Sequence, residues 1–161
     1  MLSRLFPKQI DNNYRGHVLA IWLFIPIALM NITIAVCAIV LPDGGAQSPD
    51  GVPLNTFSAG AAQTVIGVVA LIGLAKLLLG LLFILALLRY RAMIPLMYLL
   101  LVTDYIGHKW LGLVKPIMHV AGTSTGTIVL VSLFAASVIG LILSLSGKGY
   151  HPKQGMESAR P

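Results

Sequence analysis

Hydrophobic and polar positions divide the chain into four long apolar runs separated by polar segments. The runs cover residues 18–41, 64–88, 92–114 and 128–145. A bilayer core about 30 Å thick is crossed by roughly 20 helical residues, so each run is long enough to span it. The pattern therefore predicts an all-α fold, a polytopic membrane protein built as an up-and-down bundle of four transmembrane helices.

The segments around these runs predict a simple domain organisation. A basic N-terminal segment, residues 1–17, precedes a transmembrane domain at 18–147, and a polar tail follows at 148–161. The first run is longer than the roughly 7–15 apolar residues of a signal peptide, and further runs follow it, so it is expected to stay uncleaved. The loop at 42–63 is rich in Gly and Pro, and its pattern fits an ordered cap as well as a mobile loop.

Composition supports the membrane assignment and indicates which kind of partner to expect. The chain has 161 residues, of which 57% are hydrophobic and 10% charged, whereas soluble domains carry about 25% charged residues. The net charge of +6 would suggest nucleic acid in a soluble protein. Here the basic residues flank apolar runs, so the lipid bilayer is the expected partner and nucleic acid is not. The single Cys37 excludes an intrachain disulfide.

The distribution of Lys and Arg predicts which way the helices run. Three segments that share one side of a four-helix topology carry eight basic residues, namely Arg4, Lys8, Arg15, Arg89, Arg91, Lys148, Lys153 and Arg160. The opposite side has Lys115, with Lys109 near the end of the third run. Short loops rich in Lys and Arg stay in the cytoplasm. Both termini are therefore predicted to be cytoplasmic.

Two charged residues interrupt neighbouring apolar runs near their midpoints. Lys76 lies in the second run and Asp104 in the third, at equal separation from Tyr90 in the basic turn 89–91. If the two helices pack antiparallel about this turn, Lys76 and Asp104 lie at the same depth. Because a charge at the centre of a transmembrane helix costs about 2.5–3.5 kcal/mol, we expect the two side chains to pair.

Other polar groups are expected near the same depth and form a candidate intramembrane polar site. His108 lies one helical turn beyond Asp104 and on the same face. The full candidate set is Lys76, Asp104, His108, Asn31, Ser132 and Ser137. Small residues lie on the same helix faces as two members of this set. Gly73 and Gly80 share a face with Lys76, and Ala28, Ala35 and Ala38 share a face with Asn31. Small residues on one face indicate close helix packing.

Three interpretations of the charged residues stay open at this stage. The pair fixes helix register and orientation only, or it marks a proton, ion or small-molecule path, as intramembrane ionisable residues often do. In a proton path Asp104 would accept the proton, Lys76 would stabilise its charged form and His108 would relay outward. In the third interpretation no pair forms and Lys76 faces a partner protein.

Metal and catalytic chemistry are not indicated. Haem requires axial ligands at similar depth, and only His108 and His119 come into question, because His17 and His151 lie on the other side. A zinc site from Asp104, His108 and His119 would lack a fourth ligand. The sequence does not predict the strand-to-helix turn of a nucleophile elbow. We therefore expect no catalytic residues, no cofactor and no metal.

Two segments of the chain resemble a known kind of protein. The segment DNNYRGH at residues 11–17 and the segment RYRAMIPLMY at 89–98 look like small four-helix inner-membrane proteins of Gram-negative bacteria that have no assigned function. The resemblance implies a multi-pass protein of the bacterial inner membrane. It carries over no active-site residues.

Two function classes follow from these observations. The first is a non-catalytic accessory or scaffolding protein of the inner membrane, either a subunit of a larger complex or a homo-oligomer. The alternative is a proton, ion or small-molecule transport element that uses the Lys76–Asp104 pair with His108.

Overall fold

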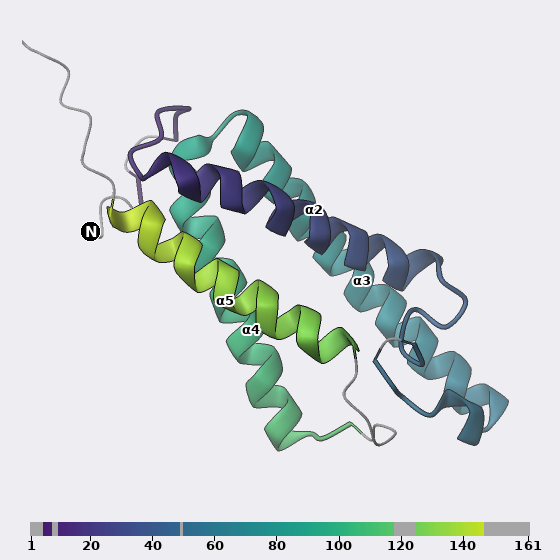
Figure 1. Cartoon of the computed structure of the whole chain (residues 1–161). Helices are drawn as coiled ribbons and strands as arrows, with labels where there is room; N and C mark the ends of the chain where they lie inside the picture. The colour runs from purple at the N-terminus through teal and green to yellow at the C-terminus, as the bar shows by residue number, and fades with distance from the viewer. Residues whose placement is uncertain (1–4, 8–9, 49, 118–124, 147–161) are drawn as a thin grey trace, which may run out of the picture.

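The computed structural model describes residues 5–7, 10–48, 50–117 and 125–146. The described chain is all-helical and contains four α-helices and two short 3₁₀ turns (Figure 1). They are α2 (Val18–Val40), η1 (Leu54–Thr56), α3 (Ala59–Leu88), η2 (Arg91–Met93), α4 (Ile94–Val114) and α5 (Thr125–Ser146). The predicted all-α class is confirmed for this part of the chain.

Three of the four helices are long and apolar enough to cross a membrane. They are α2, α3 and the Gly126–Ser146 stretch of α5. Helix α4 is outside this group, since its second half carries Asp104, His108 and Lys109. At about 1.5 Å per residue, the 30 residues of α3 extend beyond a bilayer core of about 30 Å.

Three helix starts differ from the expected ones, and two of them do so for local reasons. Helix α3 begins at Ala59 rather than at residue 64, because the Ser58 hydroxyl accepts a hydrogen bond from the Ala61 amide at 3.3 Å and caps the helix. Helix α4 begins at Ile94 rather than at residue 92, because η2 occupies the turn. Pro95 lies in its first turn, where its missing amide N–H costs little. Helix α5 begins at Thr125 rather than at residue 128.

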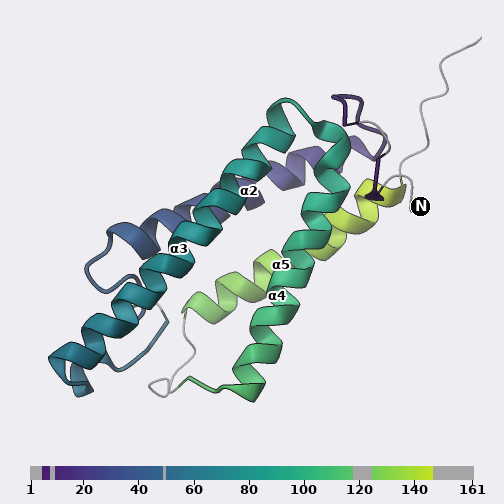
Figure 2. The same cartoon turned by 180° about the vertical axis from the view of Figure 1, so that it is seen from behind.

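The four helices form two pairs that splay apart. Helix α2 packs along α3, α4 packs along α5, and α2 also contacts α5. Figures 1 and 2 show that α3 and α4 meet at the η2 turn and then diverge, leaving an open angle between them. The α3–α4 hairpin is therefore closed at the turn and open at its far end.

Small residues bring α2 and α3 into close contact. A Cβ atom added to Gly73 would lie 2.8 Å from the Ala38 Cβ and 3.1 Å from the Ala35 carbonyl oxygen. A Cβ on Gly80 would lie 2.6 Å from the Cγ1 atom of Ile32. The small-residue faces expected on both helices are present, and they face each other.

Tyr98 is the centre of the buried core. Its side chain is fully buried, and its hydroxyl donates a 2.7 Å hydrogen bond to the Ala20 carbonyl oxygen. Its ring meets the Phe24 ring edge-on, with centroids 5.0 Å apart, and the α5 residue Gly140 lies against the same ring. Tyr98 thus joins α2, α4 and α5.

Large apolar side chains cover the outside of the bundle. Leu71, Ile142 and Leu29 are 68%, 58% and 55% exposed, and each lies on a different helix that can span a membrane. Water-soluble proteins rarely expose continuous apolar surface on this scale. The outer surface therefore suits a hydrocarbon environment.

The loop between α2 and α3 packs against α3. Ala46, Val52 and Leu54 form a small buried cluster that contacts Val69. The Asp43 carboxylate accepts hydrogen bonds from the amides of Gly45 at 3.0 Å and Ser48 at 3.2 Å. The hydrogen bond from the Gly45 amide is the main factor that lowers the Asp43 pKa. These contacts hold the described part of the loop against the first turns of α3.

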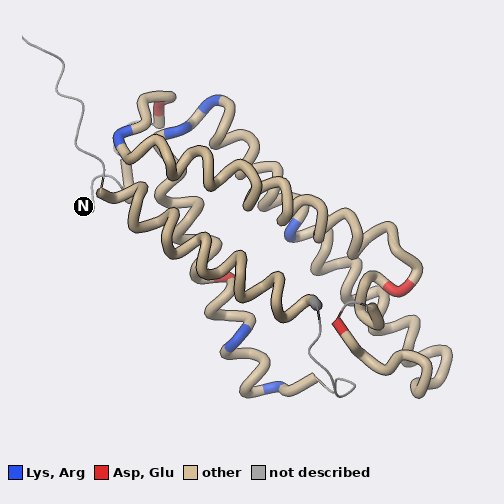
Figure 3. Tube along the Cα trace, viewed as in Figure 1, with Lys and Arg blue, Asp and Glu red and all other residues tan. Residues whose placement is uncertain are grey.

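The N-terminal segment, the α3–α4 turn and the end of α5 meet at one end of the bundle. The Ala92 amide donates to the Asp11 carbonyl oxygen at 3.3 Å, and the His17 amide donates to the Leu143 carbonyl oxygen at 3.3 Å. Figure 3 shows basic positions at this end, where α2 begins and α3 ends. We call it the basic end of the bundle.

Candidate functional site

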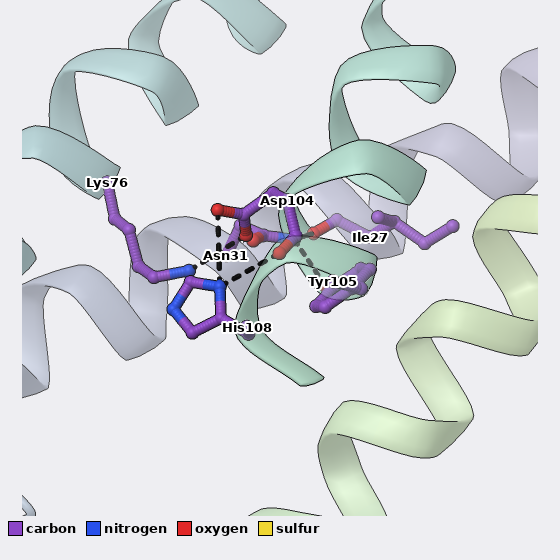
Figure 4. A network of polar contacts seen from close by, with 6 residues as sticks. All are labelled: Ile27, Asn31, Lys76, Asp104, Tyr105 and His108. Atoms are coloured by element: carbon purple, nitrogen blue, oxygen red, sulfur yellow. Dashed lines mark hydrogen bonds and ion pairs between the residues drawn. The ribbon is translucent and has the colours of Figure 1, made fainter. Parts of the chain in front are cut away.

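Lys76 and Asp104 meet across the α3–α4 hairpin. The Lys76 Nζ atom lies 3.0 Å from the Asp104 Oδ2 atom, in both hydrogen-bond and ion-pair geometry. Figure 4 shows the lysine extending from α3 to the carboxylate on α4. The predicted contact is therefore present, and it bridges the two helices where they diverge.

His108 joins the other side of the carboxylate. Its Nδ1 atom lies 2.9 Å from the backbone oxygen of Asp104 and 3.4 Å from the Oδ1 atom of the same residue (Figure 4). Both neighbours are acceptors, so Nδ1 carries a proton and donates. In the neutral ring Nε2 is then an acceptor, and this is the atom that takes up a second proton. We call Lys76, Asp104 and His108 the polar cluster.

Asn31 lies beside the polar cluster without touching its charges. Its side-chain amide donates to the Ile27 carbonyl oxygen at 2.9 Å and more weakly to the Tyr105 hydroxyl at 3.5 Å. Tyr105 follows Asp104 on α4, so this hydrogen bond holds the Asn31 amide close to the polar cluster (Figure 4). No role for Tyr105 was predicted from the sequence, although a tyrosine next to a carboxylate in the middle of an apolar helix indicates a polar contact.

The two serines of α5 do not enter the polar cluster. The Ser132 side chain is exposed, and its hydroxyl donates to the Ile128 carbonyl oxygen of its own helix at 2.8 Å. Ser137 is fully buried, and its hydroxyl has no hydrogen-bond partner among the described residues. The polar cluster is thus built by α3 and α4, with Asn31 of α2 beside it.

The polar cluster is open on one side. The side chains of Lys76 and Asp104 are 21% and 28% exposed, and that of His108 is 48% exposed. From residue 106 onward α4 is largely exposed, because the hairpin opens beyond the ion pair. The described part of the chain offers no second acceptor to the Lys76 ammonium.

The described residues contain no group of three His, Cys, Asp or Glu side chains that could hold a metal ion. His119 and His151, which entered the sequence-based discussion of haem and zinc, lie outside the described residues. The chemistry available at the polar cluster is hydrogen bonding, ion pairing and proton exchange at His108 and Asp104.

Comparisons of this chain with protein families, with curated proteins and with solved structures find no match.

Proposed function

We propose that the protein is a non-catalytic accessory subunit of a bacterial inner-membrane complex. Its polar cluster binds a transmembrane helix of another protein in the open angle between α3 and α4. The partner helix carries an Asn, Gln, Ser or Thr side chain near mid-depth. In this proposal α4 is a fourth transmembrane helix, and the four helices form an up-and-down bundle.

The observation that carries the proposal is the lateral exposure of charges between two apolar helices. Intramembrane ionisable residues almost always face protein or water, because hydrocarbon offers them no hydrogen bonds. Lys76 has three N–H donors, and one of them is directed at Asp104. With a neutral His108 the polar cluster carries no net charge, so a neutral side chain with acceptor oxygens complements it better than a carboxylate does.

The membrane orientation in this proposal places the basic end in the cytoplasm. Short segments rich in Lys and Arg remain on that side, and the N-terminal segment and the α3–α4 turn meet at that end. A C-terminal fluorescent-protein fusion is expected to be bright, and a C-terminal alkaline phosphatase fusion inactive. An active phosphatase with a dark fluorescent fusion would reverse the orientation.

Photocrosslinking in intact membranes tests the partner helix. Leu111 lies seven residues after Asp104, on the same face of α4, and is 51% exposed. With p-benzoylphenylalanine at this position we expect an adduct with a different membrane protein, mapped by mass spectrometry to one of its transmembrane helices. The adduct should be lost in K76M/D104L. The matched control carries the probe at Leu29, which is 55% exposed on α2, and should give no such adduct.

Each other result would contradict the proposed partner. An adduct between two copies of this chain would assign the open angle to self-association. Equal crosslinking at positions 111 and 29, or an adduct unchanged in K76M/D104L, would show that the polar cluster does not select the partner.

The geometry of His108 favours a second candidate, a proton-transport element. Its Nδ1 atom lies 3.4 Å from the Asp104 carboxylate, and its side chain is 48% exposed on the open side. Asp104 and His108 could then exchange a proton with water or a substrate entering the open angle. Proton uptake into vesicles that contain the purified protein separates the candidates, because transport would need no partner protein and would be abolished in D104N.

A further inference from the structure

A pocket lies at the basic end of the bundle, away from the polar cluster. It is enclosed by the N-terminal segment, the α3–α4 turn and the end of α5, and its lining includes Asn13, Tyr14, Arg15, Ala92, Pro95 and Ser144. The pocket has room for about one water-sized group. A larger ligand would therefore place one atom inside and the rest at the mouth.

One arginine lines this pocket, and a second is adjacent in sequence to a lining residue. Arg15 is part of its lining and is exposed. Arg91 directly precedes the lining residue Ala92 and is exposed, although its Nε atom donates to the Leu87 carbonyl oxygen at 3.0 Å. Asp11 is the acidic residue nearby, since its carbonyl oxygen accepts from the Ala92 amide. Two arginines and one aspartate are thus part of the pocket lining or close to it in the chain.

The wall of the pocket contains a polar group without a partner. The Tyr14 hydroxyl is buried and has no hydrogen-bond partner among the described residues. Burial raises the pKa of Tyr14 to about 12, so the hydroxyl is a neutral donor at physiological pH. A buried donor without an acceptor is unfavourable, and an acceptor oxygen within hydrogen-bond distance of this hydroxyl would remove this cost.

We propose that the pocket binds the phosphate group of an anionic phospholipid. One phosphate oxygen enters the pocket toward Tyr14 and Asn13, and the remaining oxygens stay at the mouth near Arg15 and Arg91. The pocket lies where α2 and α4 begin and α5 ends, which is the level of lipid headgroups for helices that cross a bilayer. Basic pockets between transmembrane helices on the cytoplasmic side commonly bind such headgroups.

Native mass spectrometry of the full chain, released from nanodiscs of mixed phosphatidylglycerol and phosphatidylcholine, tests the lipid site. We expect retained phosphatidylglycerol on the wild-type protein. Each basic residue near a membrane surface strengthens binding by about fivefold, so R15Q/R91Q should weaken it by roughly 25-fold. The matched control K109Q/K115Q removes the same charge from the opposite half of α4 and its end and should bind as the wild type does.

Two further measurements distinguish lipid binding in this pocket from non-specific attraction to surface charge and from binding of inorganic phosphate. Y14F keeps every charge, and we expect it to bind phosphatidylglycerol several-fold more weakly. Unchanged binding in Y14F, or equal losses in R15Q/R91Q and K109Q/K115Q, would overturn the pocket assignment. Displacement of the lipid by millimolar inorganic phosphate would make the site one for soluble phosphate and overturn the lipid proposal. Circular dichroism of each variant confirms that the helices are intact.

Discussion

Replacing one member of the Lys76–Asp104 pair should destabilise the protein more than replacing both. We expect K76M alone or D104L alone to lower the free energy of unfolding by about 2–3 kcal/mol. Each single variant leaves a charge near the middle of a helix without its partner, and a mid-helix charge costs about 2.5–3.5 kcal/mol on insertion scales. Because both side chains are partly exposed, we expect a smaller loss of unfolding free energy than for a fully buried pair.

The double variant K76M/D104L should recover most of this loss. Exchange of a buried ion pair for apolar side chains of similar volume is often neutral or stabilising. We therefore expect it to unfold within about 1 kcal/mol of the wild type, measured by circular dichroism in mixed detergent micelles. Losses that simply add in the double variant would show that the two charges do not interact.

A neighbouring lysine provides the control for this series. Lys109 lies on α4 close to Asp104 in sequence, but its side chain is exposed. K109M should change the free energy of unfolding by less than about 0.5 kcal/mol, as surface substitutions usually do. A loss as large as that of K76M would attribute the effect to removal of any lysine rather than to the ion pair.

The contact of Gly140 with Tyr98 should give the second large effect. A Cβ atom on Gly140 would overlap the Tyr98 ring, which is fully buried and held by its hydrogen bond to the Ala20 carbonyl oxygen. Overpacking of a well-packed core costs about 1–3 kcal/mol. We expect G140A to fall in the upper part of this range, measured by the same unfolding assay.

Two other helical glycines give matched controls for G140A. A Cβ atom on Gly67 or on Gly107 would meet no atom within 4 Å. Because Ala is the better helix former by about 0.5–1 kcal/mol, G67A and G107A should be neutral or stabilising. A second test is the combination with Y98L, which removes the ring. If G140A costs as much in Y98L as in the wild type, the overlap with Tyr98 is not the cause.

The hydrophobic pattern predicted an all-α chain with four transmembrane helices, of which the helical class and three helices that can span a membrane are confirmed. It also predicted the Lys76–Asp104 contact, since an antiparallel hairpin about the basic turn places equal sequence separations at equal depth. The i, i+4 spacing placed His108 beside Asp104. These predictions depend on local helical geometry, which a helix keeps regardless of its neighbours.

The arrangement of α5 and the opening of the hairpin were decided by tertiary packing. Ser132 and Ser137 were both expected in the candidate intramembrane polar site. In the structure, α5 instead turns Gly140 toward the Tyr98 ring. With that rotation Ser132 is exposed and Ser137 is buried elsewhere. Helical periodicity gives the relative positions of residues around one helix and does not say which side faces a neighbour.

The sequence by itself thus determined the helical class and the pairing of Lys76 with Asp104. Only the tertiary structure placed Asn31 beside Tyr105 and left the polar cluster open on one side. The reason is physical: α2 and α3 are held together by Gly73 and Gly80, while α4 packs along α5 and diverges from α3. The ion pair therefore connects α3 and α4, two helices that diverge because each packs against a different neighbour.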